Sequence, residues 1–209
     1  MRHSFQTEGF GIRLRPVRLE DAAFIVWLRN QDYVKGRVGD SAADTASQEA
    51  WLKKYFEREG DYYFAAETPG GISLGTHGIY DVKGVRAEQG RQIMRSEAMA
   101  GVPVAMLGTD LAFGELGLSE LRGTCVSTNR AIHSLHRKFG FKQVGILRAA
   151  QVIGGKSVDL VEFRLAAKDW FEVRDGLLPL ARLAGAQVLE WEKTESVGNQ
   201  PWVENKLQG

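Results

Sequence analysis

A histidine in a helix-forming run has the chemistry for proton transfer near neutral pH. His136 lies in the segment Arg130–Lys138, and Asn129 directly before it has a side chain suited to cap that helix. An unperturbed imidazole has a pKa of about 6.5, so His136 can donate or accept a proton in a reaction. The alternative is structural, because Ile132 and Phe139 share its helical stripe and His136 can pack with them.

The thiol chemistry of the chain is limited to a single cysteine. Cys125 has no second cysteine with which to form an internal disulfide, and no cluster of cysteine and histidine has the spacing of a zinc site. It lies between Thr124 and Val126 in a predicted strand, where it has the character of a small core residue. The sequence therefore predicts no metal, no oxidising compartment and no covalent cysteine intermediate.

Strands and helices must position these side chains, and the first part of the chain predicts one strand followed by two helices. Ile12–Arg18 alternates apolar and basic residues, as a strand with one buried face does. A helix enters at Leu19, and its apolar face consists of Ala23, Phe24, Trp27 and Leu28. Ser47–Glu59 predicts a second helix, with Ser47 as its cap.

The middle of the chain predicts a small antiparallel meander. Tyr62–Glu67, Ile72–Val82 and Glu88–Arg95 are extended stretches separated by turns rich in glycine. Apolar residues at positions 104–116 predict a helix, and Leu121–Thr128 predicts a strand before the helix that holds His136. The order from the meander onward is thus strands, helix, strand, helix.

The last part of the chain predicts a hairpin, a helix and a tail. Phe141–Ala150 and Ser157–Leu165 flank a pair of glycines, which suits a hairpin turn. Residues 170–184 predict a helix with an irregular middle around Pro179. Lys193–Gly209 is polar and weakly patterned, so we expect a mobile tail or a partner-binding arm.

The run from Asn129 to Gly145 resembles the helix-to-strand segment of the GNAT acetyltransferases, written N-x-x-A-I-x-L-Y-x-K-x-G-F with a following glycine. The positions in register are Asn129, Leu135, Lys138, Gly140, Phe141 and Gly145. The element order from Ile12 to Leu165 is also similar, above all to the branch of ribosomal-protein N-terminal acetyltransferases and acyltransferases of nucleotide-linked amino sugars. The resemblance implies an α+β fold with a mixed, mostly antiparallel central sheet of about seven strands flanked by helices, and a C-terminal helical extension.

The resemblance also implies acetyl-CoA as the acyl donor and places its binding site. Family members hold the CoA pyrophosphate on a glycine-rich turn at a helix N-terminus, where backbone N–H groups face the anion. Here residues 95–104 occupy that place, with Gly101 but without the usual second glycine. The expected cofactor-binding residues are Ile93, Met94, Arg95, Ala100, Gly101, Val102 and Asn129. Ile93 and Met94 are included as backbone oxyanion donors, on the expectation that their strand bulges as in the family.

The implied reaction is direct attack of an amine on the acetyl group, without an acyl-enzyme. In the family a tyrosine protonates the departing thiolate, and His136 stands at that position. Glu88 and His77 lie on strands from which family members draw a general base. Their structural alternatives are a carboxylate at a strand end for Glu88 and a polar core partner for His77.

The composition of the chain argues against nucleic acid and membrane as partners. The 209 residues carry 27 basic and 26 acidic side chains, a net charge of +1, so no overall field attracts nucleic acid or a membrane surface. No apolar run approaches the roughly 20 residues that span a bilayer, and the N-terminus lacks a secretory signal pattern. We expect a cytoplasmic protein with one domain at residues 1–168 and a C-terminal helix and tail at residues 169–209.

Two helices and the loop between them are expected to receive the acceptor. Arg29, Lys35 and Arg37 can hold an anionic group such as a nucleotide diphosphate, although exposed basic residues are often only solvated. The expected substrate-binding residues are Arg29, Asn30 and Arg37. A small-molecule amine on a nucleotide-linked sugar, in surface-polysaccharide biosynthesis, is the first acceptor hypothesis. The alternatives are a protein N-terminus, a polyamine or antibiotic, or a non-catalytic CoA-binding module, and a homodimer is a further candidate assembly.

Overall fold

The computed structural model describes residues 3–39, 42–197 and 200–203. The strands are β1 (Thr7–Gly9), β2 (Ile12–Pro16), β3 (Tyr62–Glu67), β4 (Ser73–Lys83), β5 (Arg86–Met94), β6 (Glu120–Val126), β7 (Lys142–Ile153) and β8 (Lys156–Ala166). The helices are α1 (Ala22–Arg29), α2 (Thr45–Tyr55), α3 (Gly101–Gly114), α4 (Arg130–Lys138) and α5 (Ala167–Glu192), with short 3-10 helices η1 (Leu19–Asp21) and η2 (Ser96–Ala98).

All of these strands belong to one sheet, in the order β1-β2-β3-β4-β5-β6-β8-β7. Neighbouring strands are antiparallel except β5 and β6, which run parallel. That parallel pair is joined only where residues 86–88 face residues 120–122. Both strands continue beyond this short pairing, so the sheet has an opening in its middle.

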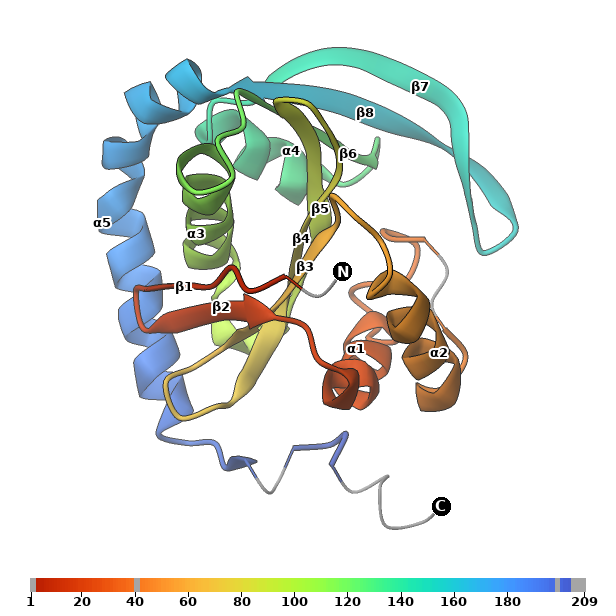
Figure 1. The fold of residues 1–209 in the computed structure, drawn as a ribbon, viewed down its shortest axis with the longest axis vertical. Coiled ribbons are helices and arrows are strands. Elements are labelled where there is room, and N and C mark those ends of the chain that lie inside the picture. Colours follow the sequence, from red (N-terminus) through yellow and green to blue (C-terminus); the bar gives the residue numbers. More distant parts are fainter. Residues whose placement is uncertain (1–2, 40–41, 198–199, 204–209) are drawn as a thin grey trace.

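Helices cover the sheet from both sides. Figure 1 shows α3 and α5 side by side against one side of the sheet, and α1 and α2 on the opposite side of β3, β4 and β5. The main core lies between α3, α5 and the sheet, and its largest buried side chains include Leu14, Phe64, Leu74, Met106 and Trp170. The expected mixed, mostly antiparallel sheet with flanking helices and a C-terminal helix is confirmed.

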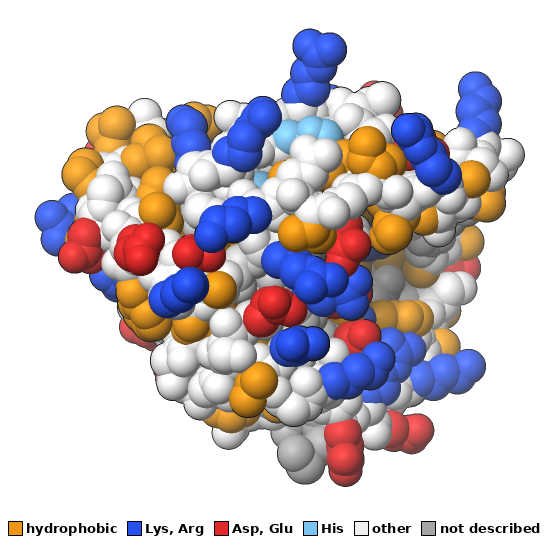
Figure 2. Space-filling model, turned by 90° about the horizontal axis from the view of Figure 1, so that it is seen from above, with side chains coloured by type: hydrophobic (Ala, Val, Ile, Leu, Met, Phe, Trp, Pro, Cys, Tyr) orange, Lys and Arg blue, Asp and Glu red, His pale blue; other side chains and the backbone are white. Residues whose placement is uncertain are grey.

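The hairpin of β7 and β8 forms one edge of the sheet and curves away from α5, over the side of the sheet where α1 and α2 lie (Figure 1). Figure 2 shows the molecule from this end, where Lys and Arg side chains alternate with acidic and apolar ones. The apolar side chains Val144, Ile146, Leu147 and Val152 of β7 are exposed. No helix among the described residues is long and apolar enough to cross a membrane.

Two differences from the sequence prediction have local causes. β1 was not predicted, because Thr7–Gly9 is short and polar and becomes a strand only by pairing with β2. α5 is one continuous helix through Pro179, longer at both ends than the predicted 170–184. Its buried stripe of Trp170, Leu177, Ala181, Ala184 and Val188 holds the whole length against the core. Packing along this stripe outweighs the break that proline favours.

Candidate active site

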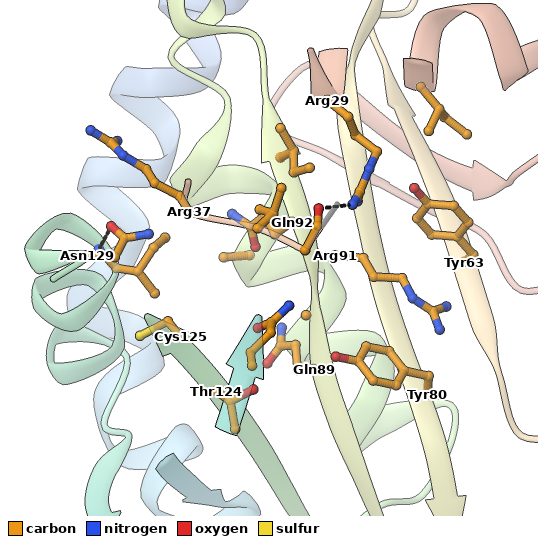
Figure 3. A pocket seen from close by; sticks show the side chains of 18 of the residues that line it. Arg29, Arg37, Tyr63, Tyr80, Gln89, Arg91, Gln92, Thr124, Cys125 and Asn129 are labelled. Atoms are coloured by element: carbon orange, nitrogen blue, oxygen red, sulfur yellow. Dashed lines mark hydrogen bonds between the residues drawn. The ribbon is translucent and has the colours of Figure 1, made fainter. Parts of the chain in front are cut away.

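A cavity of about 680 Å³ opens where β5 and β6 separate. Figure 3 shows the residues of β5 along its centre, Thr124 and Cys125 of β6 on one side, and Tyr63 and Tyr80 of the neighbouring strands on the other. α1, α2 and the segment between them also contribute lining residues, as do α4 and β7. A cavity of this size, lined by both polar and apolar side chains, fits a small-molecule site.

A bulge in β5 forms the centre of the cavity. Gly90 pairs with Gly78 and Ile93 pairs with Thr76, so two residues of β5 oppose the single residue His77 of β4. Arg91, in this bulge, has a positive φ of 51°. A bulge turns backbone groups away from regular pairing, and residues 89–93 here all line the cavity. The expected bulge in this strand is therefore present.

His77 lies behind this bulge, in a closed hydrogen-bond network and not in the cavity wall. Its Nε2 atom is 3.2 Å from Nε2 of Gln89, and its Nδ1 atom is 3.2 Å from Oε1 of Gln92. An amide nitrogen only donates, so Nε2 of His77 accepts and Nδ1 carries the proton. The amide of Gln92 then donates to the carbonyl of Gly101 at 2.9 Å, which ties β4 and β5 to the start of α3.

The burial of His77 fixes its charge as well as its position. Burial lowers the pKa of His77 to about 4, so the imidazole is neutral at neutral pH. A Cβ atom on Gly108 would lie 2.1 Å from its Nε2 atom, so α3 has a glycine where the ring approaches. These contacts match the polar core partner that was the structural alternative for this residue.

His136 does reach the cavity, from α4. Its ring stacks on Phe141, with centroids 4.6 Å apart, and meets Phe163 edge-on at 4.7 Å. Across the opening, a Cβ atom on Gly123 would lie 3.2 Å from Cε1 of His136, so the glycine in β6 admits the ring. Among the described residues the Nδ1 atom of His136 is buried without a hydrogen-bond partner.

The protonation state of His136 follows from these surroundings. Burial, together with the neighbouring His133, lowers the pKa of His136 to about 4. The side chain is therefore a neutral imidazole at neutral pH, able to accept a proton at one nitrogen and donate from the other. Cys125, on the same side of the cavity, is an inert thiol, because burial raises its pKa to about 11.

Glu88 lies at the closed end of the opening, where β5 still pairs with β6. It faces Arg122 of β6 and Tyr80 of β4 and does not line the cavity. Tyr80 does line it, and burial followed by the neighbouring Glu88 raises the pKa of Tyr80 to about 12. The phenol is thus a neutral hydrogen-bond donor above Gly90, where a Cβ atom would lie 2.7 Å from its oxygen.

Arg91 is a largely enclosed cation of the cavity wall. Its guanidinium lies 4.2 Å from the ring centroid of Tyr80, 5.4 Å from that of Tyr63 and 5.6 Å from that of Trp51. It also donates two hydrogen bonds to the buried carboxylate of Asp61. Aromatic rings and a paired carboxylate hold this charge in the cavity wall.

Arginines of α1 and of the segment after it also line the cavity, Arg29 towards Tyr63 and Arg37 beside Asn129 (Figure 3). Arg29 donates to the carbonyl of Gly39 at 2.8 Å, shown as a dashed line in Figure 3. Arg37 is exposed and lines the cavity. Asn30 is turned away, with its amide donating to the carbonyl of Val26 as part of the end of α1. Among the described lining residues there is no Asp or Glu.

The hairpin of β7 and β8 closes one end of the cavity. A shift in register between Leu147 and Gln151 bends β7, and Asp159 accepts from the N–H of Ala149 within the bend at 2.9 Å. Gln151 lines the cavity, and its Nε2 atom would lie 2.8 Å from a Cβ atom on Gly39. β7 therefore reaches the segment between α1 and α2.

The expected cofactor-binding residues fall into two groups. Ile93 and Asn129 line the cavity, and the side chain of Asn129 caps α4 by accepting from the N–H of Ile132. The rest of the set does not line it: Met94, Arg95, Ala100, Gly101 and Val102.

Ala100, Gly101 and Val102 form the N-terminus of α3. The first bond inside this helix runs from the N–H of Val104 to the carbonyl of Ala100, and Pro103 has no N–H. The N–H groups of Gly101 and Val102 thus belong to the first turn, whose donors have no partner within a helix. The side chain of Arg95, by contrast, is buried among other protein groups.

Sequence reasoning missed Trp51, Tyr80, Arg91 and Gln151, which all line the cavity. They come from α2, β4, β5 and β7, and their spacing in the sequence does not indicate that they lie close together in the fold. The one available signal was the pair of glycines at positions 78 and 90, which face each other beside the bulge. Within the described residues, no group of His, Cys, Asp and Glu side chains could hold a metal ion.

We compared the chain with models of known protein families and with known proteins. A family model described as an acetyltransferase (GNAT) domain matches residues 12–142. Comparison with curated protein sequences gives no match.

Several solved structures share the fold. The apo form of FdhC, a nucleotide-linked sugar GNAT, superposes with a TM-score of 0.70 at 24% identity, over 86% of this chain and 98% of that one. Spermidine N-acetyltransferase from Vibrio cholerae, in complex with CoA and spermine, has a TM-score of 0.68 at 18% identity, over 78% and 99%. A GCN5-related N-acetyltransferase from Brucella melitensis has a TM-score of 0.68 at 20% identity, over 95% and 91%. Identities this low establish the fold alone.

Proposed function

Because the chain belongs to the GNAT acetyltransferase family, whose members transfer acetyl groups from acetyl-CoA, we propose that its acceptor is the amino group of a nucleotide-linked amino sugar used in surface-polysaccharide biosynthesis. The observation that carries this proposal is the charge of the cavity. Arg29, Arg37 and Arg91 line it, and no described lining residue is acidic.

This charge distribution discriminates between acceptors that the shared fold allows. A polyamine carries several positive charges and needs carboxylates in its site, since like charges at close range oppose binding. A nucleotide diphosphate carries negative charges that a guanidinium binds with paired hydrogen bonds. Arg37, which is exposed and lines the cavity, is the proposed group to receive it.

The start of α3 is the proposed site for the pyrophosphate of acetyl-CoA. The N–H groups of Gly101 and Val102 and the positive end of the helix dipole favour an anion there. The contact uses backbone atoms, so the missing second glycine of the family pattern does not prevent it. The network from His77 through Gln92 to the carbonyl of Gly101 supports this turn from beneath.

The proposed reaction is direct attack of the neutral amine on the acetyl carbonyl carbon. The new N–C bond forms, the C–S bond breaks, and one proton moves from the amine nitrogen to the thiolate sulfur. The backbone N–H of Ile93, which lines the cavity next to the β5 bulge, is the proposed donor to the carbonyl oxygen. Met94, the other donor expected from the sequence, does not line the cavity. His136 is neutral and lines the cavity, so it is the proposed carrier of the proton.

His77 and Glu88 have weaker support as the general base. His77 uses both ring nitrogens within its own network, and Glu88 lies beyond Tyr80 from the cavity. For Glu88 the proposed contribution is through Tyr80, whose hydroxyl lies over Gly90 at the bulge.

A thiol-release assay with acetyl-CoA tests the acceptor. We expect release with nucleotide-linked amino sugars and none with spermidine, aminoglycosides or N-terminal peptides. Arg37→Ala should raise the KM for the nucleotide-linked sugar about tenfold and leave the KM for acetyl-CoA unchanged. Lys35→Ala is the matched control, since Lys35 is exposed in the same loop, pairs with Asp32 and does not line the cavity.

Other outcomes of the same assay would contradict the proposal. Release with peptides alone would identify a protein N-terminal acetyltransferase, and release with spermidine alone would identify a polyamine acetyltransferase. Acetyl-CoA binding without release across the panel would identify a non-catalytic CoA-binding module.

A further inference from the structure

The C-terminal segment folds back onto the loop that precedes α3. α5 ends at Glu192, and residues 193–197 and 200–203 are described beyond it. Gln200 is 3% exposed and Trp202 is 8% exposed, so this part packs against the body and is not the mobile tail that the sequence suggested. It lies outside residues 12–142, which the family model matches.

Arg95 joins this segment to the loop. Its Nη1 atom donates to Oε1 of Gln200 at 2.7 Å, and its Nε atom donates to Oε1 of Glu97 at 2.8 Å. Its Nη2 atom lies 3.6 Å from Oε2 of Glu195. With 6% of its surface exposed, Arg95 uses its guanidinium entirely within the protein.

Three tryptophans from separate parts of the chain surround the same guanidinium. Their ring centroids lie 4.6 Å away for Trp191 of α5, 5.4 Å for Trp202 and 5.6 Å for Trp27 of α1. Trp202 also packs on Phe24 and Trp27, with centroids 4.6 Å and 4.7 Å apart. A planar guanidinium suits such a site, because it can stack on rings while its edges donate hydrogen bonds.

Arg95 links these contacts to the start of α3, the proposed binding site for the pyrophosphate of acetyl-CoA. Arg95 directly follows β5 and begins the loop that ends at Ala100, before the first turn of α3. Within this loop Met99 has a positive φ of 49°, a conformation that non-glycine residues keep only where surrounding contacts hold it. On the other side, Trp202 shares a buried cluster with Ile93, which lines the cavity.

We infer that Trp191, Glu195, Gln200 and Trp202 form a C-terminal brace that clamps Arg95 and so holds the 95–100 loop in the shape that binds acetyl-CoA. Arg95 is then a positioning residue and not a ligand of the cofactor. The inference rests on the proposed cofactor site at the start of α3. If the brace favours the binding shape, acetyl-CoA must stabilise the brace to the same extent, because coupling between two sites is reciprocal.

Calorimetric titration with acetyl-CoA tests the forward effect. Trp202→Ala should weaken acetyl-CoA binding about tenfold, and Trp202→Phe should restore most of it because the aromatic contact remains. Two controls should bind as the wild type does: truncation after Val203, and Leu183→Ala, which removes an exposed apolar side chain from α5. Equal affinity of folded Trp202→Ala and wild type would overturn the brace.

Limited trypsin digestion of the wild-type chain tests the reverse effect and needs no variant. Lys193 lies at the end of α5 with an exposed side chain, so cleavage after it releases three residues of the brace, Glu195, Gln200 and Trp202. Saturating acetyl-CoA should slow this cleavage about tenfold. Mass spectrometry of the released peptide measures the rate. An unchanged cleavage rate in a chain that binds acetyl-CoA overturns the brace alone, whereas a wild-type chain that does not bind acetyl-CoA overturns the cofactor site as well.

Discussion

At the scale of single residues, His136 is the side chain on which the proposed chemistry depends most. Replacing it with phenylalanine keeps the stacking on Phe141 and Phe163 but removes both ring nitrogens. We expect His136→Phe to lower kcat about a hundredfold, the usual contribution of a positioned acid or base, while the KM for acetyl-CoA changes little. Steady-state kinetics with the accepted sugar measures both, and an unchanged kcat would remove His136 from the mechanism.

The pH profile of the same variant pair checks the protonation state. Burial and His133 lower the pKa of His136 to about 4, so its ring does not titrate between pH 6 and 8. The wild type should therefore show no inflection near the ordinary histidine value in that range. An inflection there that disappears in His136→Phe would show that the ring titrates in the free enzyme.

The residues also show what sequence reasoning could reach. A local pattern or a loop position identified His136, Asn129 and Arg37 as candidates, and all three line the cavity. Their roles stay predictions. His77 was also a candidate for proton transfer from its residue type. In the fold its ring packs against Gly108 of α3, which is far away in the sequence, so the sequence alone did not show that it is buried. Arg91 was missed for the related reason that a bulge, and not the strand pattern, turns it towards the cavity.

At the scale of elements, α3 depends on a close approach to β4. A Cβ atom at position 108 would overlap the ring of His77, which cannot move without breaking its bonds to Gln89 and Gln92. Gly108→Ala should destabilise the protein by about 1–3 kcal/mol, the usual cost of overpacking a core. Gly114→Ala is the matched control in the same helix, because nothing lies within 4 Å of its added Cβ atom.

Urea unfolding of the two variants separates the effects. Gly114→Ala should be neutral or stabilising by up to roughly 1 kcal/mol, since alanine is favoured over glycine in helices. A Gly108→Ala protein as stable as Gly114→Ala would contradict the close packing of α3 on His77.

Elements with a strong local signal were predicted well, and those that depend on packing were not. The asparagine cap and the glycine after it marked α4 to the residue, from Arg130 to Lys138. β1 has no apolar alternation and exists through its pairing with β2. The continuity of α5 past Pro179 follows from its buried stripe, which also includes Gly185, where a Cβ atom would lie 2.2 Å from the carbonyl oxygen of Phe10.

At the scale of the whole molecule, segments far apart in the chain meet at Arg95, directly after β5. The sequence identified the family segment that forms one wall of the opening, at α4 and the strand after it. It did not identify the return of the C-terminal segment to Arg95, because Gln200 and Trp202 are isolated signals in a polar stretch. Contacts between segments this far apart in the chain become visible only in the folded structure.

Buried histidines also give the whole protein a pH-dependent stability. Burial lowers the pKa of His77 to about 4, whereas in the unfolded chain it has its ordinary value of about 6.5. Between these values the unfolded state binds more protons, so the free energy of unfolding falls as the pH decreases from 6.5 towards 4. From pH 7 to pH 5, His77 alone should account for a loss of about 2 kcal/mol.

His77→Gln isolates this contribution, because glutamine can donate to Gln92 and accept from Gln89 without titrating. Urea unfolding at pH 7 and pH 5 should show a smaller loss of stability in the variant than in the wild type, by about the same 2 kcal/mol. The remaining slope should come largely from His136, whose pKa is lowered to a similar value by burial. Equal slopes for variant and wild type would mean that His77 is protonated as readily in the fold as outside it, and the neutral network joining β4, β5 and α3 would then be wrong.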